Sequence, residues 1–206
     1  MPTALPTWPR KYYSPDGGQP FLFYVVYGDI ETNAPLDGQR YRSAGVPDGL
    51  DLMHYGPGSN HPEVPGTFRD GYLWDEFQVA DPVLAAMVAQ CKSCLVLRGE
   101  PTDATTLNYL RDAVGLITYL LDQGGVCVYD PLMFRWWGAE QWRKTILEPA
   151  AAVPRQHTVT LYSAEENDPT KKWFHTRGMR KFGRPDISVH DVRPELDAAV
   201  IDLSPA

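Results

Sequence analysis

A helical apolar pattern in the middle of the chain constrains the fold most. Large apolar residues recur there at alternating spacings of three and four: Leu107, Leu110, Val114, Ile117 and Leu121. This spacing places them on one face of an α-helix. Gly124 and Gly125 follow, and glycine is typical just beyond a helix C-terminus. Short apolar runs at 95–97 and 126–129 flank the helix and predict buried strands, so we expect it to pack on a sheet.

Further elements are predicted on both sides of this helix. Residues 21–27 are apolar at each position, which is typical of a strand covered on both faces. Asp81 and Pro82 match the N-cap and first position of another helix. Five of its residues share one helical face: Val83, Leu84, Met87, Val88 and Cys91. The remaining predicted elements are a helix over about 139–147 and strands over 157–162, 172–176 and 186–192.

These elements predict an α+β or mixed α/β fold. Helices alternate with strands in the middle of the chain, and strands follow one another near its end. We therefore expect one layered domain over 21–206, with a mixed sheet and about three helices packed on it. Residues 1–20 predict an irregular arm, and 33–66, with eleven prolines and glycines, predict a long loop. The Asp70-Gly71 dipeptide predicts a hairpin turn, and Asp103 or Thr105 is the predicted cap of the central helix.

The charge balance narrows the range of partners. The chain has 26 Asp and Glu against 19 Lys and Arg, a net charge of −7. Binding to nucleic acid or to an anionic membrane needs clustered cations, so neither is expected. The N-terminus has no secretory pattern, and the apolar run at 21–27 is too short to cross a bilayer. We therefore expect a cytoplasmic protein.

The three cysteines, Cys91, Cys94 and Cys127, are expected to be reduced thiols. Cys91 and Cys94 have the Cys-x-x-Cys spacing, but a structural zinc site needs four ligands and no second pair is present. A redox role is disfavoured because Cys91 ends a predicted helix. We expect small buried apolar side chains instead. The chain also lacks the phosphate-binding, dinucleotide-binding and zinc-protease motifs, so no cofactor is predicted.

Asp29 and Glu31 follow the strand predicted at 21–27 and are the candidate metal ligands. Carboxylates at a strand end suit Mg²⁺, and two such ions can act on a phosphodiester. The stretch from Asp29 to Thr32 resembles the first motif of the DEDD-type 3′–5′ exonucleases. This resemblance implies a divalent-metal-dependent nuclease. The later motifs are incomplete, since Arg111 stands where the second has an aromatic residue.

A cluster of positive charge lies at 171–184, which holds six Lys and Arg and no Asp or Glu. The cluster can bind a phosphate, a carboxylate or an acidic loop. Alternatively, acids at 165–168 and 186 can neutralise it. Aromatic residues at 134–142 suit an interface, although most of them are expected in the core. The candidate anion- or partner-binding residues are His175, Arg177, Arg180, Lys181, Arg184, Trp136 and Trp137.

Residues 175–186, HTRGMRKFGRPD, carry a second resemblance. They resemble a Gly-x-x-x-Phe-Gly-x-Pro-Asp/Glu signature of bacterial proteins with a domain of unknown function. The central helix, the glycine pair and VCVYDP at 126–131 occur there in a similar order, so the resemblance covers roughly residues 94–192. It implies a bacterial cytoplasmic protein and supplies no catalytic residue.

Several classes of function follow from these patterns. The first is a non-catalytic protein-binding module. An immunity-type protein that neutralises a toxin is one version, since an acidic protein complements a cationic toxin. The second is an enzyme, either the nuclease above or a hydrolase that uses His175 or His190 with a nearby Asp. The third is a small-anion-binding protein that uses 171–184. We predict the first, with another protein, in particular a basic one, as the partner.

Overall fold

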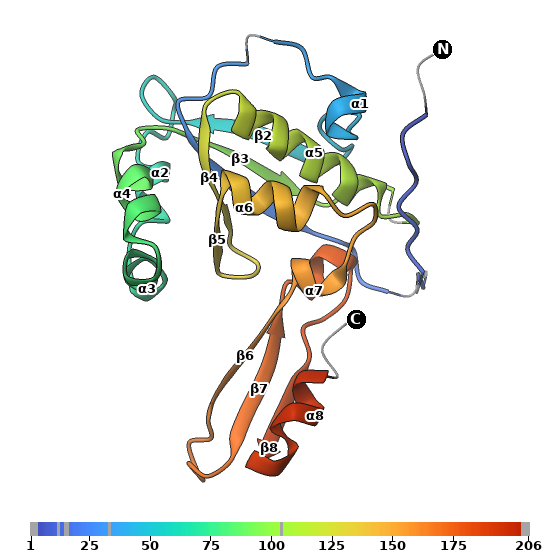
Figure 1. The fold of residues 1–206 in the computed structure, drawn as a ribbon, viewed down its shortest axis with the longest axis vertical. Coiled ribbons are helices and arrows are strands. Elements are labelled where there is room, and N and C mark those ends of the chain that lie inside the picture. The colour runs from blue at the N-terminus through green and yellow to red at the C-terminus, as the bar shows by residue number, and fades with distance from the viewer. Residues whose placement is uncertain (1–3, 12, 15–16, 33, 104, 203–206) are drawn as a thin grey trace.

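The centre of the fold is a five-stranded antiparallel sheet in the order β2-β3-β1-β4-β5 (Figure 1). It is seen in a computed structural model that describes residues 4–11, 13–14, 17–32, 34–103 and 105–202. The strands are β1 (Leu22–Gly28), β2 (Leu50–Tyr55), β3 (Cys94–Gly99), β4 (Gly125–Asp130) and β5 (Arg135–Gly138). The middle strand, β1, is buried along nearly its whole length, as predicted for a strand covered on both faces.

The helix α5 (Asn108–Asp122) covers one face of this sheet, and its apolar stripe is buried as predicted. It connects β3 to β4, and β1 lies between these two strands. β3 and β4 each pair with β1 in an antiparallel manner, so the two run in the same direction without being neighbours. The sheet is therefore antiparallel throughout, whereas the sequence predicts a mixed sheet. No helix in the described part of the chain is long and apolar enough to span a bilayer.

Shorter helices complete the layer on the α5 side. α1 (Gly38–Tyr41) packs against α5, where the rings of Tyr41 and Tyr119 meet edge to face at 5.6 Å. α6 (Ala139–Trp142) continues into a π-helical turn, η1 (Arg143–Leu147), which confirms the helix predicted over about 139–147. Trp142 is buried here, and its Nε1 donates to Oγ1 of Thr118 at 3.0 Å. This bond fixes the α6 segment on α5.

The other face of the sheet is covered by α3 (Tyr72–Ala80) and α4 (Pro82–Gln90), which follow the short α2 (Val64–Thr67). Successive residues of a strand point to opposite faces. Accordingly, Tyr24 and Val26 belong to the hydrophobic cluster under α5, and Val25 and Tyr27 belong to the cluster under α3 and α4. The central sheet thus has a hydrophobic core on each side.

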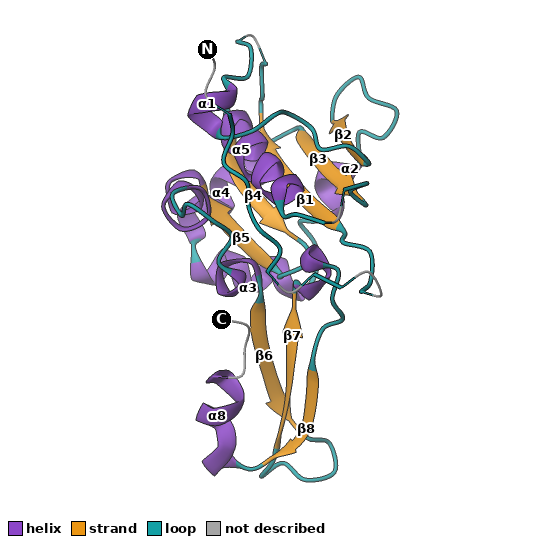
Figure 2. Cartoon of the chain, turned by 90° about the vertical axis from the view of Figure 1, so that its right-hand side faces the viewer, coloured by secondary structure: helices purple, strands orange, loops and turns teal. Residues whose placement is uncertain are grey.

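A second, three-stranded antiparallel sheet projects away from the central layer (Figures 1 and 2). Its strands are β6 (Val159–Ala164), β7 (Lys172–Arg177) and β8 (Ser188–Val192), in the order β6-β7-β8. α7 (Pro154–His157) leads into it, and a 3-10 turn, η2 (Met179–Phe182), lies between β7 and β8. η3 (Pro194–Leu196) and α8 (Asp197–Asp202) follow. This sheet confirms the three predicted C-terminal strands, and it is separate from the central one.

A buried ion pair links η2 to the central sheet. Nζ of Lys181 donates to the carboxylate of Asp130, at the end of β4, and to the carbonyl oxygen of His157 at 2.9 Å. The Lys181 and Asp130 side chains are 0% and 2% exposed. Burial lowers the pKa of Lys181 and raises that of Asp130, while their mutual attraction opposes both shifts. The hydroxyl of Tyr109, on α5, donates to the Lys181 carbonyl at 2.8 Å.

The α+β class is confirmed, and several local predictions are wrong. The described chain has eight α-helices rather than about three. The predicted loop at 33–66, whose first residue lies outside the described residues, contains α1, β2 and α2. Asp70 and Gly71 precede a helix instead of closing a hairpin, because Gly71 (φ 77°) is the N-cap of α3. The N-cap of α5 is Leu107; Asp103 accepts from the Thr105 backbone in a turn before it.

Candidate functional site

The predicted cationic residues contact different parts of the molecule. The guanidinium of Arg177 lies 5.0 Å from the ring centre of Phe134, and that of Arg180 lies 4.8 Å from the ring centre of Phe21. Lys181 is buried against Asp130 and is therefore a structural residue, not a ligand-binding one. Arg184 lines a cavity beside η2.

Acidic residues pair with the two lysines that begin the basic cluster. Nζ of Lys171 lies 3.6 Å from Asp168 and 3.0 Å from Asp191, and Lys172 pairs with Asp197. The sequence predicts this role for Asp168, whereas Asp191 belongs to β8 itself and Asp197 begins α8. This part of the cluster is neutralised internally, as one of the two predicted alternatives states.

Trp136 and Trp137 are core residues, which corrects their assignment as partner-binding candidates. They are 9% and 1% exposed. As neighbours on β5 they point to opposite faces of the sheet. Trp136 stacks on Phe77 of α3 at 4.7 Å and on Tyr129 of β4 at 4.2 Å. Its role is to hold α3 on the sheet.

Asp29 and Glu31 lie in the exposed segment after β1. Oδ1 of Asp29 accepts from the hydroxyl of Ser93 at 3.3 Å, and the backbone N–H of Glu31 donates to the Gln123 carbonyl at 3.0 Å. Among the described residues, no three His, Cys, Asp or Glu side chains gather closely enough to hold a metal ion. The described residues therefore offer no third ligand beside Asp29 and Glu31, the predicted metal-binding pair.

His190 takes part in a hydrogen-bonded chain on β8. Its Nε2 lies 3.2 Å from Oγ of Ser188, and its Nδ1 lies 3.1 Å from Oε1 of Glu165, so the acid partner is Glu and not the predicted Asp. Trp173 stacks on the His190 ring at 5.2 Å and donates from Nε1 to Ser188 at 2.7 Å. Ser188 and His190 are both exposed on the strand.

This Ser–His–Glu order matches the connectivity of a hydrolase triad, but its setting differs. Acyl transfer needs an enclosed place for the substrate and donors for the oxyanion. The cavity beside Phe182 and the smaller one beside Val200 are both lined by other residues, although His175 lines the second. His175 contributes a buried Nδ1 without a hydrogen-bond partner. The hydrogen bonds among Ser188, His190 and Glu165 therefore stabilise the exposed face of the second sheet. They do not by themselves make an active site.

The cysteines are thiols in apolar surroundings. Cys94 and Cys127 are buried in the cluster under α3 and α4, and Cys91 is half-buried at the end of α4. Burial raises the pKa of Cys94 to about 12 and raises the pKa of Cys91 as well. Thiols with raised pKa values are poor nucleophiles at neutral pH.

The most distinctive surface is the outer side of α3 and α4. The two helices are fixed firmly. Asp81 caps α4 by accepting from the backbone of Leu84 at 3.0 Å. At the other end of α4, Nη1 of Arg69 donates to three carbonyls, those of Val88, Ala89 and Cys91, at 2.9–3.0 Å. These bonds satisfy the carbonyls that a helix C-terminus leaves open.

The inner side of these helices is packed and the outer side is apolar and open. Trp74, Phe77, Ala85 and Val88 are buried on the sheet. Four of the twelve exposed large hydrophobic side chains of the described chain lie on the outer side: Tyr72, Val79, Val83 and Met87, at 72%, 85%, 72% and 48% exposure. The apolar face predicted for α4 is therefore only partly buried. Ala85 packs against the sheet, whereas Val83 and Met87 point away from it. Contiguous exposed apolar patches are typical of interaction sites, which makes this side of the helices a candidate.

The same segment carries only negative charge. Residues 70–90 contain four exposed acids, Asp70, Asp75, Glu76 and Asp81, and no Lys or Arg. The preceding cation, Arg69, is held by the α4 carbonyls. We call Tyr72, Asp75, Glu76, Val79, Asp81, Val83 and Met87 the α3–α4 surface. A sequence signal for α3 exists: Trp74 and Phe77 have helical spacing, and the acid Asp75 suits a first turn.

Comparison with known proteins gives no relative from which to assign this site. The chain matches no protein-family model, no curated protein and no solved structure.

Proposed function

We propose that this protein is a non-catalytic protein-binding module of the bacterial cytoplasm, and that the α3–α4 surface binds a basic protein. A cationic toxin that the module neutralises by occupying its surface is one such partner. The observation that carries the proposal is the combination of four exposed apolar side chains with four acids and no cation between residues 70 and 90. A partner must supply apolar contacts and positive charge together.

The two properties of the surface have separate effects on binding. Full burial of a Val, Met or similar side chain contributes roughly 1.5–3 kcal/mol, so Val79, Val83 and Met87 supply affinity. The acids attract a cationic partner over a longer range and increase the association rate, an effect that salt screens. We therefore expect binding that weakens with salt but is not abolished by it.

The surface is also held in shape before a partner arrives. Trp74 and Phe77 lie against Trp136 at 5.4 and 4.7 Å, which fixes α3 on the central sheet. Arg69 closes the end of α4. A surface that is already ordered loses little conformational entropy on binding. This rigidity favours a docking role over that of a mobile lid.

A comparative pull-down from the native host tests the proposal. The bait is the full chain, the double variant Val79→Lys/Val83→Lys, and a control, Val46→Lys/Ile187→Lys. The control changes the charge equally and replaces apolar residues that are 43% and 46% exposed elsewhere. We expect a basic protein to be retained in stoichiometric amount by the full chain and the control, and at least about tenfold less by the first variant.

Three outcomes would contradict the proposal. The first is equal retention of the captured protein by the α3–α4 variant and the full chain. The second is that no stoichiometric partner is recovered. The third is that the recovered partner is acidic and its binding is insensitive to salt.

A further inference from the structure

The second sheet has an edge strand, β6, that lacks the features by which proteins protect an open strand edge. In the described part of the chain, β6 has a neighbour on one side only, which is β7. Its sequence, VTLYSA, includes no charged residue, proline or glycine, and the whole strand pairs with β7 without a break in register. Valine, threonine and tyrosine favour extended backbone. A regular, uncharged strand of this kind can accept a further strand at its open edge.

The other three edge strands of the two sheets are protected. β2 carries an exposed charge, Asp51. β5 has only four residues, begins with Arg135 and leads directly into α6. β8 pairs irregularly with β7 and contains Asp191, which has a φ of 57°. Charge, short length and irregular pairing each hinder the addition of a strand, so β6 is the edge at which a sheet of this protein can be extended.

The backbone of β6 presents hydrogen-bonding groups to its open side. The N–H of Glu165, directly after β6, donates to the Lys171 carbonyl at 3.1 Å, so the backbone of residue 165 points towards the β7 side. Successive residues of a strand alternate in the direction of their backbone groups. Ser163 therefore also faces β7, whereas Tyr162 and Ala164 direct N–H and C=O to the open side. The Tyr162 side chain is 63% exposed.

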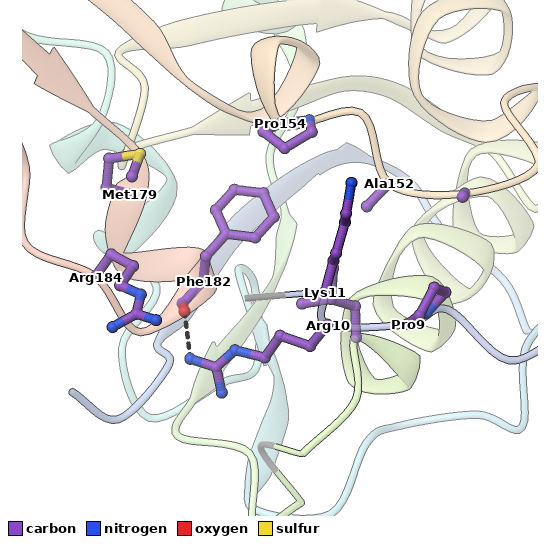
Figure 3. Close-up of a pocket in the computed structure, with 10 residues that line it drawn as sticks. Pro9, Arg10, Lys11, Ala152, Pro154, Met179, Phe182 and Arg184 are labelled. Atoms are coloured by element: carbon purple, nitrogen blue, oxygen red, sulfur yellow. Dashed lines mark hydrogen bonds between the residues drawn. The ribbon is translucent and has the colours of Figure 1, made fainter. Parts of the chain in front are cut away.

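The second sheet is fixed at its base and projects away from the central layer (Figures 1 and 2). Figure 3 shows one attachment, in which Nη2 of Arg10 donates to the Phe182 carbonyl of η2. The N-terminal arm that carries Arg10 is itself held at the start of α5, because the N–H of Leu107 donates to the Trp8 carbonyl at 2.9 Å. The buried ion pair between η2 and β4 is a second attachment. A further strand can therefore reach β6 without any opening of the fold.

We propose that β6 pairs with β6 of a second copy of this chain, in antiparallel orientation, about a two-fold axis at Tyr162. In this register Tyr162 of each copy exchanges both backbone hydrogen bonds with Tyr162 of the other. The two tyrosine side chains lie opposite each other on the same face of the sheet. The two three-stranded sheets become one continuous sheet, with a central layer at each of its ends.

Self-complementarity and charge favour a second copy over an unrelated strand. An antiparallel pair of identical strands obeys two-fold symmetry, so one kind of open edge satisfies both partners. The chain has a net charge of −7, and the acidic α3–α4 surface would repel its counterpart on another copy. β6 carries no charge that opposes such a contact. The opposed tyrosines add an aromatic contact across the axis.

Sedimentation velocity on the full chain, over a series of concentrations, tests the proposal. We expect a reversible dimer. Tyr162→Lys places like charges opposite each other and removes the aromatic pair, so it should weaken the dimer by about tenfold. The matched control is Tyr13→Lys, which makes the same replacement at a tyrosine of the N-terminal arm that is 41% exposed. It should form the dimer as the full chain does.

Disulfide formation tests the register. In Tyr162→Cys the two new thiols would lie opposite each other at the axis, so mild oxidation should link the two chains. Ala164→Cys is the control, because its thiols would be roughly 13 Å or more apart along the strands, too far for a disulfide. The unmodified chain, in which Cys91 is half-buried, serves as the blank and should stay unlinked.

Thermal unfolding of each variant establishes that it is folded. A full chain that is monomeric at every concentration would overturn the proposal, and so would a dimer that Tyr162→Lys leaves as stable as before. Equal cross-linking of Tyr162→Cys and Ala164→Cys would overturn the pairing about Tyr162.

This inference is independent of the proposed protein-binding function. β6 and the α3–α4 surface share no residue. Val79→Lys/Val83→Lys should form the dimer as the full chain does, and Tyr162→Lys should retain the basic protein partner. Failure of one proposal can therefore be distinguished from failure of the other.

Discussion

The α3–α4 pair and the η2 segment are both attached to the central sheet, but by different physical means. Aromatic stacking holds α3, where Trp136 lies between Phe77 and Tyr129. A buried ion pair, Lys181 with Asp130, holds η2. The apolar attachment needs no charge, so the acids of α3 and α4 remain on the surface. The ionic attachment requires one specific partner and depends on protonation.

The largest expected effect is at the ionic attachment. Lys181→Met leaves Asp130 buried without its cation, which should lower the free energy of unfolding by about 3–5 kcal/mol. Lys181→Met/Asp130→Leu removes both charges and should recover most of this loss. Urea denaturation followed by tryptophan fluorescence measures both. A loss below about 1 kcal/mol in the single variant would show that the pair does not hold η2 as described.

The buried imidazole of His157, beside the ionic attachment, predicts that the stability of the fold depends on pH. Burial, with the nearby Lys181 charge, lowers the pKa of His157 to about 3. The unfolded chain, with an ordinary histidine pKa near 6.5, takes up the proton first as the pH falls. Stability should therefore fall as the pH is lowered from about 6 to 4, by up to about 1.4 kcal/mol per pH unit from this group.

His157→Leu isolates the contribution of this imidazole, because carboxylates titrate in part of the same pH range. Denaturation at several pH values should give a shallower slope for the variant than for the full chain. Equal slopes would mean that His157 accepts a proton in the folded state.

A smaller effect is expected at the end of α4. Arg69→Met removes the donor to the carbonyls of Val88, Ala89 and Cys91, and should cost about 1–2 kcal/mol. Hydrogen exchange should also become faster in the last turn of α4 and stay unchanged in η2. If exchange increases in both regions, the two attachments are coupled, and the comparison between them fails.

The smallest effect is expected on the α3–α4 surface itself. Val79 and Val83 are 85% and 72% exposed, so Val79→Lys/Val83→Lys should change the free energy of unfolding by no more than about 0.5 kcal/mol. The same denaturation experiment measures this. A loss above about 2 kcal/mol would place these side chains in the core and withdraw them as a docking surface.

Local patterns predicted the parts of the fold that depend on them. The stripe of α5 and the uniformly apolar β1 show their structure within a single segment. β2 is harder to predict from the sequence, because an edge strand of mixed polarity between two glycines has the composition of a loop. Only its pairing with β3 shows it to be a strand. The Asp-Gly signal before α3 was ambiguous, since a glycine with positive φ serves a hairpin and a helix N-cap equally.

The candidate sites depended on contacts that no local pattern contains. The sequence places Lys181 in a basic surface cluster, because its partner, Asp130, lies 51 positions away in the chain. Val83 and Met87 have the spacing of core residues, and only the position of α4 at the sheet leaves them exposed. Strand periodicity does predict that Trp136 and Trp137 face opposite sides, so at most one of them was suited to any single surface.

The central position of β1 has a consequence for synthesis on the ribosome. Both neighbours of this strand, β3 and β4, are encoded after it, and about 100 residues separate the end of β1 from the end of β4. At a translation rate of roughly 5–20 residues per second, the apolar β1 segment waits on the order of 5–20 seconds for its second partner. During that interval its open edges can pair with other nascent chains. Slow translation or scarce chaperones should therefore lower the yield of this protein by aggregation before its folding is complete.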